Sequence, residues 1–193
     1  CKFDCEGGEK GLRIITSFCY ESIRSDVGVL FAAKVLEKPI KRVESFHTGQ
    51  GGASGGTIET GFSIGDLNLG KDMQDPFLLN PEDSVSPEQR SLSSDRVRIR
   101  KNKFIDAWTG PFIMAAMNTR VVRRSAALLE ARQEAYGVDF TYQEHAFYQK
   151  YFNAFLVSFA TLFSMIIIAT PLKKLVRRFL PKPGSGPSKE TMR

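Results

Sequence analysis

The chain has 193 residues, of which 42% are hydrophobic, and this is enough for one sizeable domain with its own core. Its formal net charge of +6 arises in residues 171–193, where seven Lys and Arg accompany one Glu, while the remaining residues carry 20 charges of each sign. This distribution argues against a nucleic-acid groove and favours contact of the C-terminal segment with acidic lipid headgroups.

The three cysteines, Cys1, Cys5 and Cys19, match no zinc-ligand spacing, and neither histidine has metal-ligating neighbours, so we expect no metal site.

The first third of the chain alternates strand and helix patterns. Residues 12–20 are rich in β-branched and aromatic side chains, which predicts a buried strand. Asp26 is expected to cap a helix over residues 27–38, and residues 41–48 are expected to form the next strand. The order strand, helix, strand predicts an α/β layer.

A glycine-rich loop, GQGGASGG, occupies residues 49–56 between that strand and an apolar helix pattern around residues 57–67. A dinucleotide-binding fold presents its phosphate site in this way. However, Ser54 stands where the fingerprint needs Gly or Ala, and no β-branched run follows that could supply the acidic ribose ligand. The loop is therefore interpreted as a tight connection or as the wall of a ligand cleft, with phosphate binding as the weakest alternative.

The middle of the chain contains a long polar excursion and then a helix. Residues 71–103 are rich in Asp, Pro, Ser, Asn and Arg and predict a long loop. Residues 111–137 predict a helix, with Pro111 in its first turn and Gly137 at its end. Residues 138–147 alternate enough to predict a strand. Residues 1–147 together are expected to form one α/β domain.

An apolar segment follows, since residues 151–172 contain no charged side chain. Its length suits a transmembrane or membrane-embedded helix, which we assign to residues 148–172, although a core helix of a soluble protein is the alternative. Residues 173–181 place Lys173, Lys174, Arg177 and Arg178 opposite apolar side chains, which predicts a basic amphipathic helix on a membrane surface. Residues 182–193 are expected to form a flexible tail on the cytosolic or equivalent side.

Two groups of polar residues are candidate substrate-binding positions. Ser22 and Asp26 lie in the expected turn before the first helix, where Asp26 serves as a cap or faces the substrate. Asn118, Arg120 and Arg124 lie in the helix of residues 111–137. Arg120 and Arg124 are four residues apart and share a face, which predicts either an anion-binding pair or a solvated basic surface.

Six segments together resemble the C-terminal half of the saccharopine-dehydrogenase-like oxidoreductases, which include the bacterial trans-acting enoyl reductases. These segments are YESIRSDVGV (20–29), GGASGGTIET (51–60), DPFLLNPE (75–82), GPFIMAAMNTRVVRRSAALL (110–129), YGVDFTYQE (136–144) and FLPKPGSGPS (179–188). One departure is Arg24, which replaces a proline that is usual in the family and puts the shape of the cleft in doubt.

The resemblance implies a fold and a cofactor. It implies a mixed sheet covered by helices, of class α/β (α+β), that forms the second domain of an oxidoreductase whose N-terminal Rossmann domain binds NAD or NADP. It places the glycine loop, Gly51, Gly52, Ser54, Gly55 and Gly56, near the nicotinamide. Because the chain begins at Cys1 without a signal-peptide pattern, we interpret it as a processed product or a fragment. Since the resemblance places the nucleotide-binding domain upstream, we expect this chain alone to bind no dinucleotide tightly and to be inactive.

Two functions remain open from the sequence. The first is the substrate-side and membrane-anchoring part of an NAD(P)-linked oxidoreductase that acts on an apolar or lipid-like substrate. The second is a structural or accessory subunit of an organellar membrane complex, mitochondrial for example, that keeps the domain as a scaffold. Both predict membrane lipid as a partner and a location at an organellar membrane, the endoplasmic reticulum or the surface of a lipid droplet, and neither predicts nucleic acid as a partner.

Overall fold

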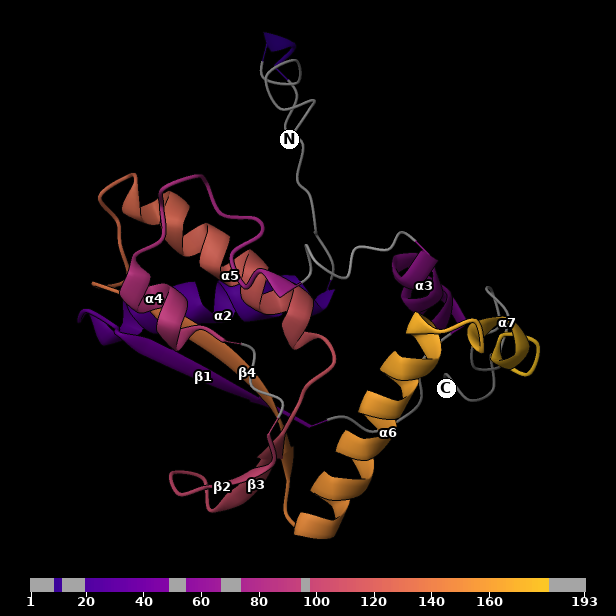
Figure 1. Ribbon diagram of the computed structural model, residues 1–193. Coiled ribbons are helices and arrows are strands. Elements are labelled where there is room, and N and C mark those ends of the chain that lie inside the picture. Colours follow the sequence, from indigo (N-terminus) through magenta and orange to yellow (C-terminus); the bar gives the residue numbers. More distant parts are fainter. Residues whose placement is uncertain (1–8, 12–19, 49–54, 67–73, 95–97, 181–193) are drawn as a thin grey trace, which may run out of the picture.

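The computed structural model describes residues 9–11, 20–48, 55–66, 74–94 and 98–180. A mixed four-stranded sheet with the order β1-β4-β3-β2 lies at its centre (Figure 1). β1 (Arg42–His47) runs parallel to β4 (Thr141–Tyr148), and β3 (Ala107–Gly110) and β2 (Arg100–Asn102) continue the sheet in antiparallel pairs. The predicted α/β class and mixed sheet are therefore confirmed.

Two helices, α2 (Tyr20–Leu36) and α5 (Ala115–Glu130), lie side by side on one face of β1 and β4 (Figure 1). The core between helices and sheet is a cluster of buried apolar side chains: Val29, Ile40, Val122, Tyr136, Phe140 and Tyr142. These residues come from both helices, from β4 and from the segments that flank β1 and β4. The core thus holds together parts of the chain that are distant in sequence.

The first helix begins earlier than the sequence predicts. Tyr20 opens α2 and is not in a strand, while residues 12–19 lie outside the described part of the chain. Asp26 is inside the helix, so the prediction that it caps the helix is wrong. Ser22 and Ser25 favour a turn by local preference, but both are buried against α5 and β4, and these tertiary contacts override that preference. Arg24 is likewise helical, and it forms an exposed ion pair with Glu21 at 2.8 Å.

The later elements agree with the predicted order and differ in length. α3 (Gly55–Asp66) follows the glycine loop as expected. The polar excursion contains a short helix, α4 (Pro87–Leu92), which begins with a capping box formed by Ser86 and Gln89. α5 is shorter than the predicted helix, because residues 111–114 approach it in turns and residues 131–139 leave it in turns and bends.

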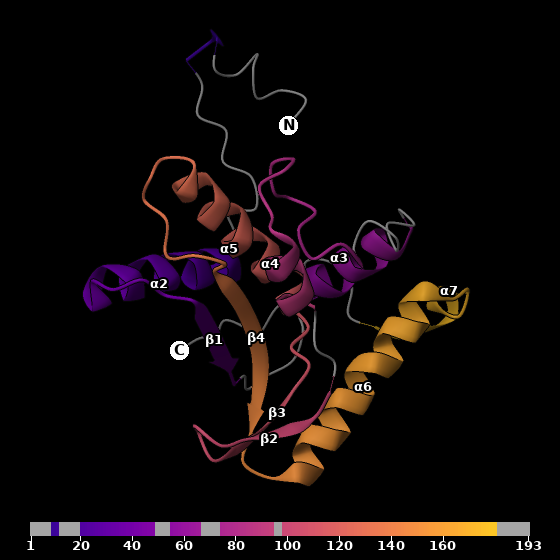
Figure 2. The same ribbon diagram turned by 60° about the vertical axis from the view of Figure 1, so that its left-hand side comes forward.

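The apolar segment forms a continuous helix, α6 (Tyr151–Ala169), that lies across β3 at the far end of the sheet from α2 (Figure 2). Small residues permit the close approach. Ala154 and Ser158 are buried, and a Cβ added to Gly110 of β3 would come within 2.7 Å of Ser158 Oγ. Residues Tyr151–Ile168 have a mean hydropathy of 1.9, and 11% of them are buried. Within the described residues, this is the one helix long and apolar enough to cross a membrane.

The basic segment after α6 is less helical than predicted. α7 covers Lys173–Val176, whereas the sequence predicts an amphipathic helix over residues 173–181. Turn hydrogen bonds continue for a few residues, and Phe179 N donates to Val176 O at 3.0 Å. Pro181 disfavours helical geometry in Leu180, the residue before it, but this does not account for the end of α7 at Val176.

Gly137 is a position where any side chain is expected to disturb the core. A Cβ at this site would lie 2.6 Å from the carbonyl oxygen and 2.9 Å from the nitrogen of Ile40, both of which are backbone atoms. We expect Gly137→Ala to lower the free energy of unfolding by about 1–3 kcal/mol, as overpacking usually does. The measurement is urea unfolding in detergent, followed by circular dichroism.

Gly28 provides the matched control. It is exposed on α2, and an added Cβ would meet nothing within 4 Å. Gly28→Ala should therefore raise the free energy of unfolding by roughly 0.5–1 kcal/mol through helix propensity alone. Equal effects of the two substitutions would contradict the close packing at Gly137.

Candidate functional site

A fully buried carboxylate, that of Glu144 on β4, lies where α2 and α5 meet the sheet. Its Oε1 accepts hydrogen bonds from Ser25 Oγ at 2.6 Å and from Tyr142 Oη at 2.7 Å. Its Oε2 accepts a hydrogen bond from Asn118 Nδ2 at 3.0 Å. Because a buried carboxylate is costly unless donors surround it, these contacts are required for the helices to pack here. We call Glu144 and its hydrogen-bonded neighbours the Glu144 cluster.

Two residues predicted from the sequence belong to this cluster. Ser22 Oγ donates to Asn118 Oδ1 at 2.9 Å, and both side chains are fully buried. Ser22 and Ser25 are three residues apart on α2 and therefore face the same side, toward α5 and β4. The fold thus joins Ser22 of the predicted turn to the asparagine of the later helix, although 96 positions separate Ser22 from Asn118.

His47 brings the cluster close to solvent. The parallel pairing of β1 with β4 places it beside Ala146. Its Nε2 lies 2.9 Å from Ser45 Oγ and 3.6 Å from Glu144 Oε1. The imidazole stacks on the ring of Phe112, with centroids 4.5 Å apart. The side chain is 12% exposed, so His47 joins the buried carboxylate to the surface.

The charge state of the cluster follows from its hydrogen bonds. Burial tends to raise the pKa of Glu144, but the nearby imidazole of His47 and then the hydrogen bonds from Ser25, Tyr142 and Asn118 outweigh burial and lower this pKa overall. Burial, followed by the negative charge of Glu144, raises the pKa of the Tyr142 phenol. At neutral pH the cluster therefore contains a buried anion and a protonated phenol that donates to it.

A polar groove of about 500 Å³ opens between α2 and β1 beside the cluster. Its lining includes Ser25, Ser45, His47 and Tyr142. The volume is within the range of small-molecule sites, and the hydroxyl and imidazole groups suit a carbonyl or carboxamide group. His47 adds an imidazole, the side chain that most often serves as a general acid or base. The arrangement is therefore able to bind an uncharged polar group and to transfer a proton.

Asp26 joins the two helices. Its Oδ2 accepts a hydrogen bond from Ser125 Oγ of α5 at 2.8 Å. Burial raises the pKa of Asp26, and the hydrogen bond from Ser125 only partly opposes this. Burial and then the charge of Asp26 raise the pKa of Tyr136 to about 12. Asp26 thus contributes to helix packing, and a role for it in substrate binding stays a prediction.

The two predicted arginines occupy different environments. Arg120 is 1% exposed, and its Nη1 donates to the carbonyl oxygen of Ala116 at 2.7 Å. Arg124 is exposed, and its Nη1 donates to the carbonyl oxygen of Leu79 at 2.7 Å. The shared solvent-facing surface that their spacing suggests is therefore not formed. Binding of an anionic group by either residue stays a prediction.

The predicted glycine loop is only partly described. Gly51, Gly52 and Ser54 lie outside the described residues, whereas Gly55 and Gly56 open α3. α3 packs on α6, where a Cβ added to Gly61 would lie 3.5 Å from Ile168 Cδ1. In a dinucleotide-binding unit the helix after the loop covers the sheet, and α3 does not do so. The position of the loop near a nicotinamide stays a prediction.

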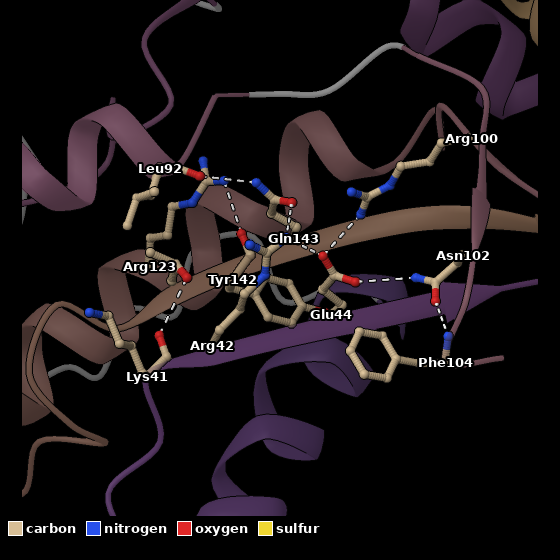
Figure 3. A network of polar contacts seen from close by, with 11 residues as sticks. Lys41, Arg42, Glu44, Leu92, Arg100, Asn102, Phe104, Arg123, Tyr142 and Gln143 are labelled. Atoms are coloured by element: carbon tan, nitrogen blue, oxygen red, sulfur yellow. Dashed lines mark hydrogen bonds and ion pairs between the residues drawn. The ribbon is translucent and has the colours of Figure 1, made fainter.

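A second polar network lies on the other face of the sheet and joins β1, β2 and β4 (Figure 3). Glu44 accepts hydrogen bonds from Arg42 and, at 3.0 Å, from Arg100. Arg42 also donates to Gln143 Oε1 at 3.2 Å, and Gln143 Nε2 donates to the carbonyl oxygen of Leu92 at 3.1 Å. Burial tends to raise the pKa of Glu44, but the two arginines lower it overall. Consecutive residues of a strand point to opposite faces of the sheet. The network around Glu44 therefore lies on one face, and the Glu144 cluster lies on the other.

Sequence reasoning missed Glu144, His47 and Tyr142 as site residues. The available signal was an acidic residue in the middle of a strand pattern, TYQEHAFY, where a buried charge requires partners. The partners come from three other elements, and no spacing within the sequence reveals them. Within the part of the chain that the structure describes, no group of His, Cys, Asp and Glu side chains is arranged to hold a metal ion.

Replacement of the buried carboxylate tests this geometry. Glu144→Gln places an N–H group opposite donors, so we expect it to lower the free energy of unfolding by ~1–3 kcal/mol at pH 7. Because the folded-state pKa is lowered, Glu144 stabilises the wild type above the ordinary value of 4.5, and this contribution is lost as the pH falls through the folded-state pKa. Urea unfolding from pH 7 to pH 3 should therefore show a decreasing difference between wild type and variant.

Asp26→Asn is the control, because here the pH dependence of stability has the opposite sign. The pKa of Asp26 is raised by burial, so its ionised form destabilises the fold, and this cost appears as the pH rises above the ordinary value of 3.8. Relative to Asp26→Asn, the wild type should lose stability with rising pH. A Glu144→Gln difference that does not change with pH would contradict the assignment of a buried carboxylate.

Comparison with curated proteins finds relatives along almost the whole chain. A Mycobacterium tuberculosis protein whose name assigns it provisionally to the trans-acting enoyl reductases is 34% identical over 208 aligned positions, which cover 95% of this chain and 48% of that protein. Trans-acting enoyl reductases of Mycobacterium ulcerans and Mycobacterium bovis are each 30% identical, over 96% of this chain and 49% of their own length.

The comparisons define what the chain is related to. No family model matches the chain, and no solved structure matches it. The chain spans about half the length of the curated relatives that it matches. These relatives share the name trans-acting enoyl reductase, which is provisional for the first of them.

Proposed function

We propose that this chain is the substrate-side part of an NAD(P)-linked oxidoreductase of the saccharopine-dehydrogenase-like group, which reduces an enoyl-type, lipid-like substrate at a membrane. The observation that carries the proposal is the similarity of 95% of the chain to a protein assigned to the trans-acting enoyl reductases. The nucleotide-binding domain is expected elsewhere in the parent protein, so this chain alone is inactive.

The polar groove supplies what such a reduction needs from the substrate side. Reduction of a conjugated double bond adds a hydride to one carbon and a proton to the other, and the bound nicotinamide supplies the hydride. Ser45 Oγ and His47 Nε2, which are 2.9 Å apart, form a hydrogen-bonded pair that supplies the proton. The carboxylate of Glu144, 3.6 Å from Nε2, orients the imidazole from the buried side.

The outer surface of α6 suits contact with lipid. Phe155, Phe159 and Phe163 stack along it at i, i+4 spacing, with ring centroids 6.3 Å and 6.2 Å apart, and each is about half exposed. An exposed apolar row of this length favours burial in a bilayer. Lys174 and Arg178 are exposed just beyond the helix, where they suit anionic headgroups. The basic end then faces the cytosol or an equivalent compartment.

Nucleotide titration tests the proposed enzyme. We expect NADH or NADPH to bind the product of the complete gene and to be oxidised when a trans-2-enoyl thioester is added. The 193-residue chain should neither bind nor oxidise either nucleotide. If the complete protein shows no binding, the scaffold function of an accessory membrane subunit replaces the enzyme, and tight binding to the short chain would assign the nucleotide site to the glycine loop.

His47→Gln tests the proton donor within that experiment. In the complete protein we expect a loss of kcat of about 10²–10⁴, the usual contribution of a general acid, with little change in nucleotide affinity. Thr48→Ala is the control, because Thr48 lines the same groove and carries no group that titrates near neutral pH. Equal losses in the two variants would remove His47 from the mechanism.

Flotation with vesicles tests the membrane contact. We expect the wild-type chain to float with vesicles of phosphatidylcholine and phosphatidylserine, and the triple variant Phe155→Ser, Phe159→Ser, Phe163→Ser to remain in the soluble fraction, because it loses the apolar row of α6. Phe104→Ser is the control, since Phe104 is 97% exposed but lies on the turn between β2 and β3. Flotation of the triple variant at the wild-type level would contradict the proposal.

A further inference from the structure

A second cavity, of about 210 Å³, lies between the N-terminal end of α5, β4 and α6. We propose that it binds the acyl chain of the substrate, an inference that rests on the proposed function and specifies where the apolar part of the substrate lies. Its apolar lining comes from two sides: Phe112, Ile113, Ala115 and Ala116 before and in α5, and Leu162 and Met165 on α6. The volume exceeds the roughly 150 Å³ that suffices for a dry apolar cavity to bind benzene.

Ser94, Glu144 and His145 also line the cavity, and the carboxylate of Glu144 accepts the hydrogen bonds described above. Several other polar groups of the wall have partners within the protein. Arg123 donates to the carbonyl oxygens of Pro76 at 2.8 Å and Tyr142 at 3.0 Å. Thr119 Oγ1 donates to the carbonyl oxygen of Ala115 at 2.6 Å, and Thr161 Oγ1 donates to that of Val157 at 2.9 Å. Gln143 is bound by Arg42 and Leu92 as described above. These walls therefore present mainly carbon to the cavity, which suits a hydrocarbon chain better than a charged head.

The cavity is continuous with the lipid-facing surface of α6. Leu162 and Met165 line the cavity and are nevertheless 41% and 44% exposed. Phe159 and Phe163, on the same helix, are 58% and 52% exposed. An acyl chain that enters from this apolar surface therefore reaches the cavity without crossing charged side chains of α6, which has none between Tyr151 and Ala169.

The cavity also adjoins the polar groove. Phe112 lines the cavity, His47 lines the groove, and their rings stack at 4.5 Å with an interplanar angle of 2°. One layer of aromatic side chains thus separates the site for the apolar chain from the site with the proton donor. A substrate with its chain under α6 has its polar end directed toward the Ser45–His47 pair.

Photochemical labelling tests the proposal. The protein in nanodiscs is exposed to a saturated acyl thioester of N-acetylcysteamine with a diazirine at the last carbon, and labelled residues are identified by mass spectrometry. We expect labels on Ile113, Ala116 and Met165. A parallel sample carries the diazirine in a phospholipid tail, and we expect its labels on outward-facing residues such as Phe155 and Phe159.

Two neighbouring positions on α6 provide a matched pair. Thr161 lines the cavity, whereas Ala160 is exposed and is not part of the lining. We expect Thr161→Phe to abolish thioester labelling of the cavity residues and Ala160→Phe to preserve it. Ala116→Leu fills the cavity from α5 and repeats the test if Thr161→Phe fails to fold, as judged by circular dichroism.

The outcomes separate this inference from the proposed function. Labelling of the outer surface alone, equal labelling in both α6 variants, or cavity labelling by the phospholipid but not by the thioester would each overturn the acyl-chain site. Labelling needs no turnover, so an absence of NAD(P)H oxidation in the complete protein with normal cavity labelling would reject the reductase and keep the site. Turnover without cavity labelling would reject the site and keep the reductase.

Discussion

The buried carboxylate of Glu144 is the constraint on which the arrangement of this domain depends. An anion removed from water must be surrounded by donors. Here α2 supplies Ser25, α5 supplies Asn118, β4 itself supplies Tyr142, and β1 brings His47. A shift of either helix along the sheet would leave the charge without part of this set. One side chain therefore specifies how two helices and two strands fit together.

The buried charge of Glu144 also affects the groove at the surface. The carboxylate is inaccessible, but the imidazole beside it is not, so the charge acts on the groove through His47. On the opposite face, Glu44 with its two arginines ties β1 to β2 and β4 and keeps the strands in register (Figure 3). The two acidic side chains thus have different uses: one is shielded and defines a site, and the other is partly solvated and stabilises the sheet.

The sequence predicts the elements whose signals are local. The strand at residues 41–48, the helix after the glycine loop and the apolar helix after residue 150 all show their own periodicity or composition, and all are present. The helix start at Asp26 was wrong because a capping preference of about 1 kcal/mol is weaker than the tertiary hydrogen bonds of the preceding turn. The amphipathic helix expected over residues 173–181 is helical only over Lys173–Val176, because apolar spacing predicts a helix face but does not fix where the helix ends.

The site was predictable only in part, for the same reason. Ser22 and Asn118 could be selected as polar residues at matching motif positions, and the structure places them in one cluster. Glu144 could not be connected to them, because its partners are brought close by sheet register and helix packing. The spacing of Arg120 and Arg124 suggested a common surface, but side-chain burial separates them, and burial of a helix face depends on what packs against it.

The parallel pairing of β1 with β4 has a consequence for the way this chain is made. Lys41 and Thr141 are hydrogen-bonded to each other at the start of the paired strands, although they are 100 positions apart in sequence. Ser25 is 119 positions from Glu144, to which it donates a hydrogen bond. Contacts between residues so far apart in sequence form late in folding. The chain loses the entropy of closing the long intervening segment before these contacts contribute favourable free energy. During synthesis the sheet is complete only when Tyr148 has left the ribosome, and α6 begins three residues later. Closure of the domain and emergence of its apolar helix are therefore nearly simultaneous events on the nascent chain.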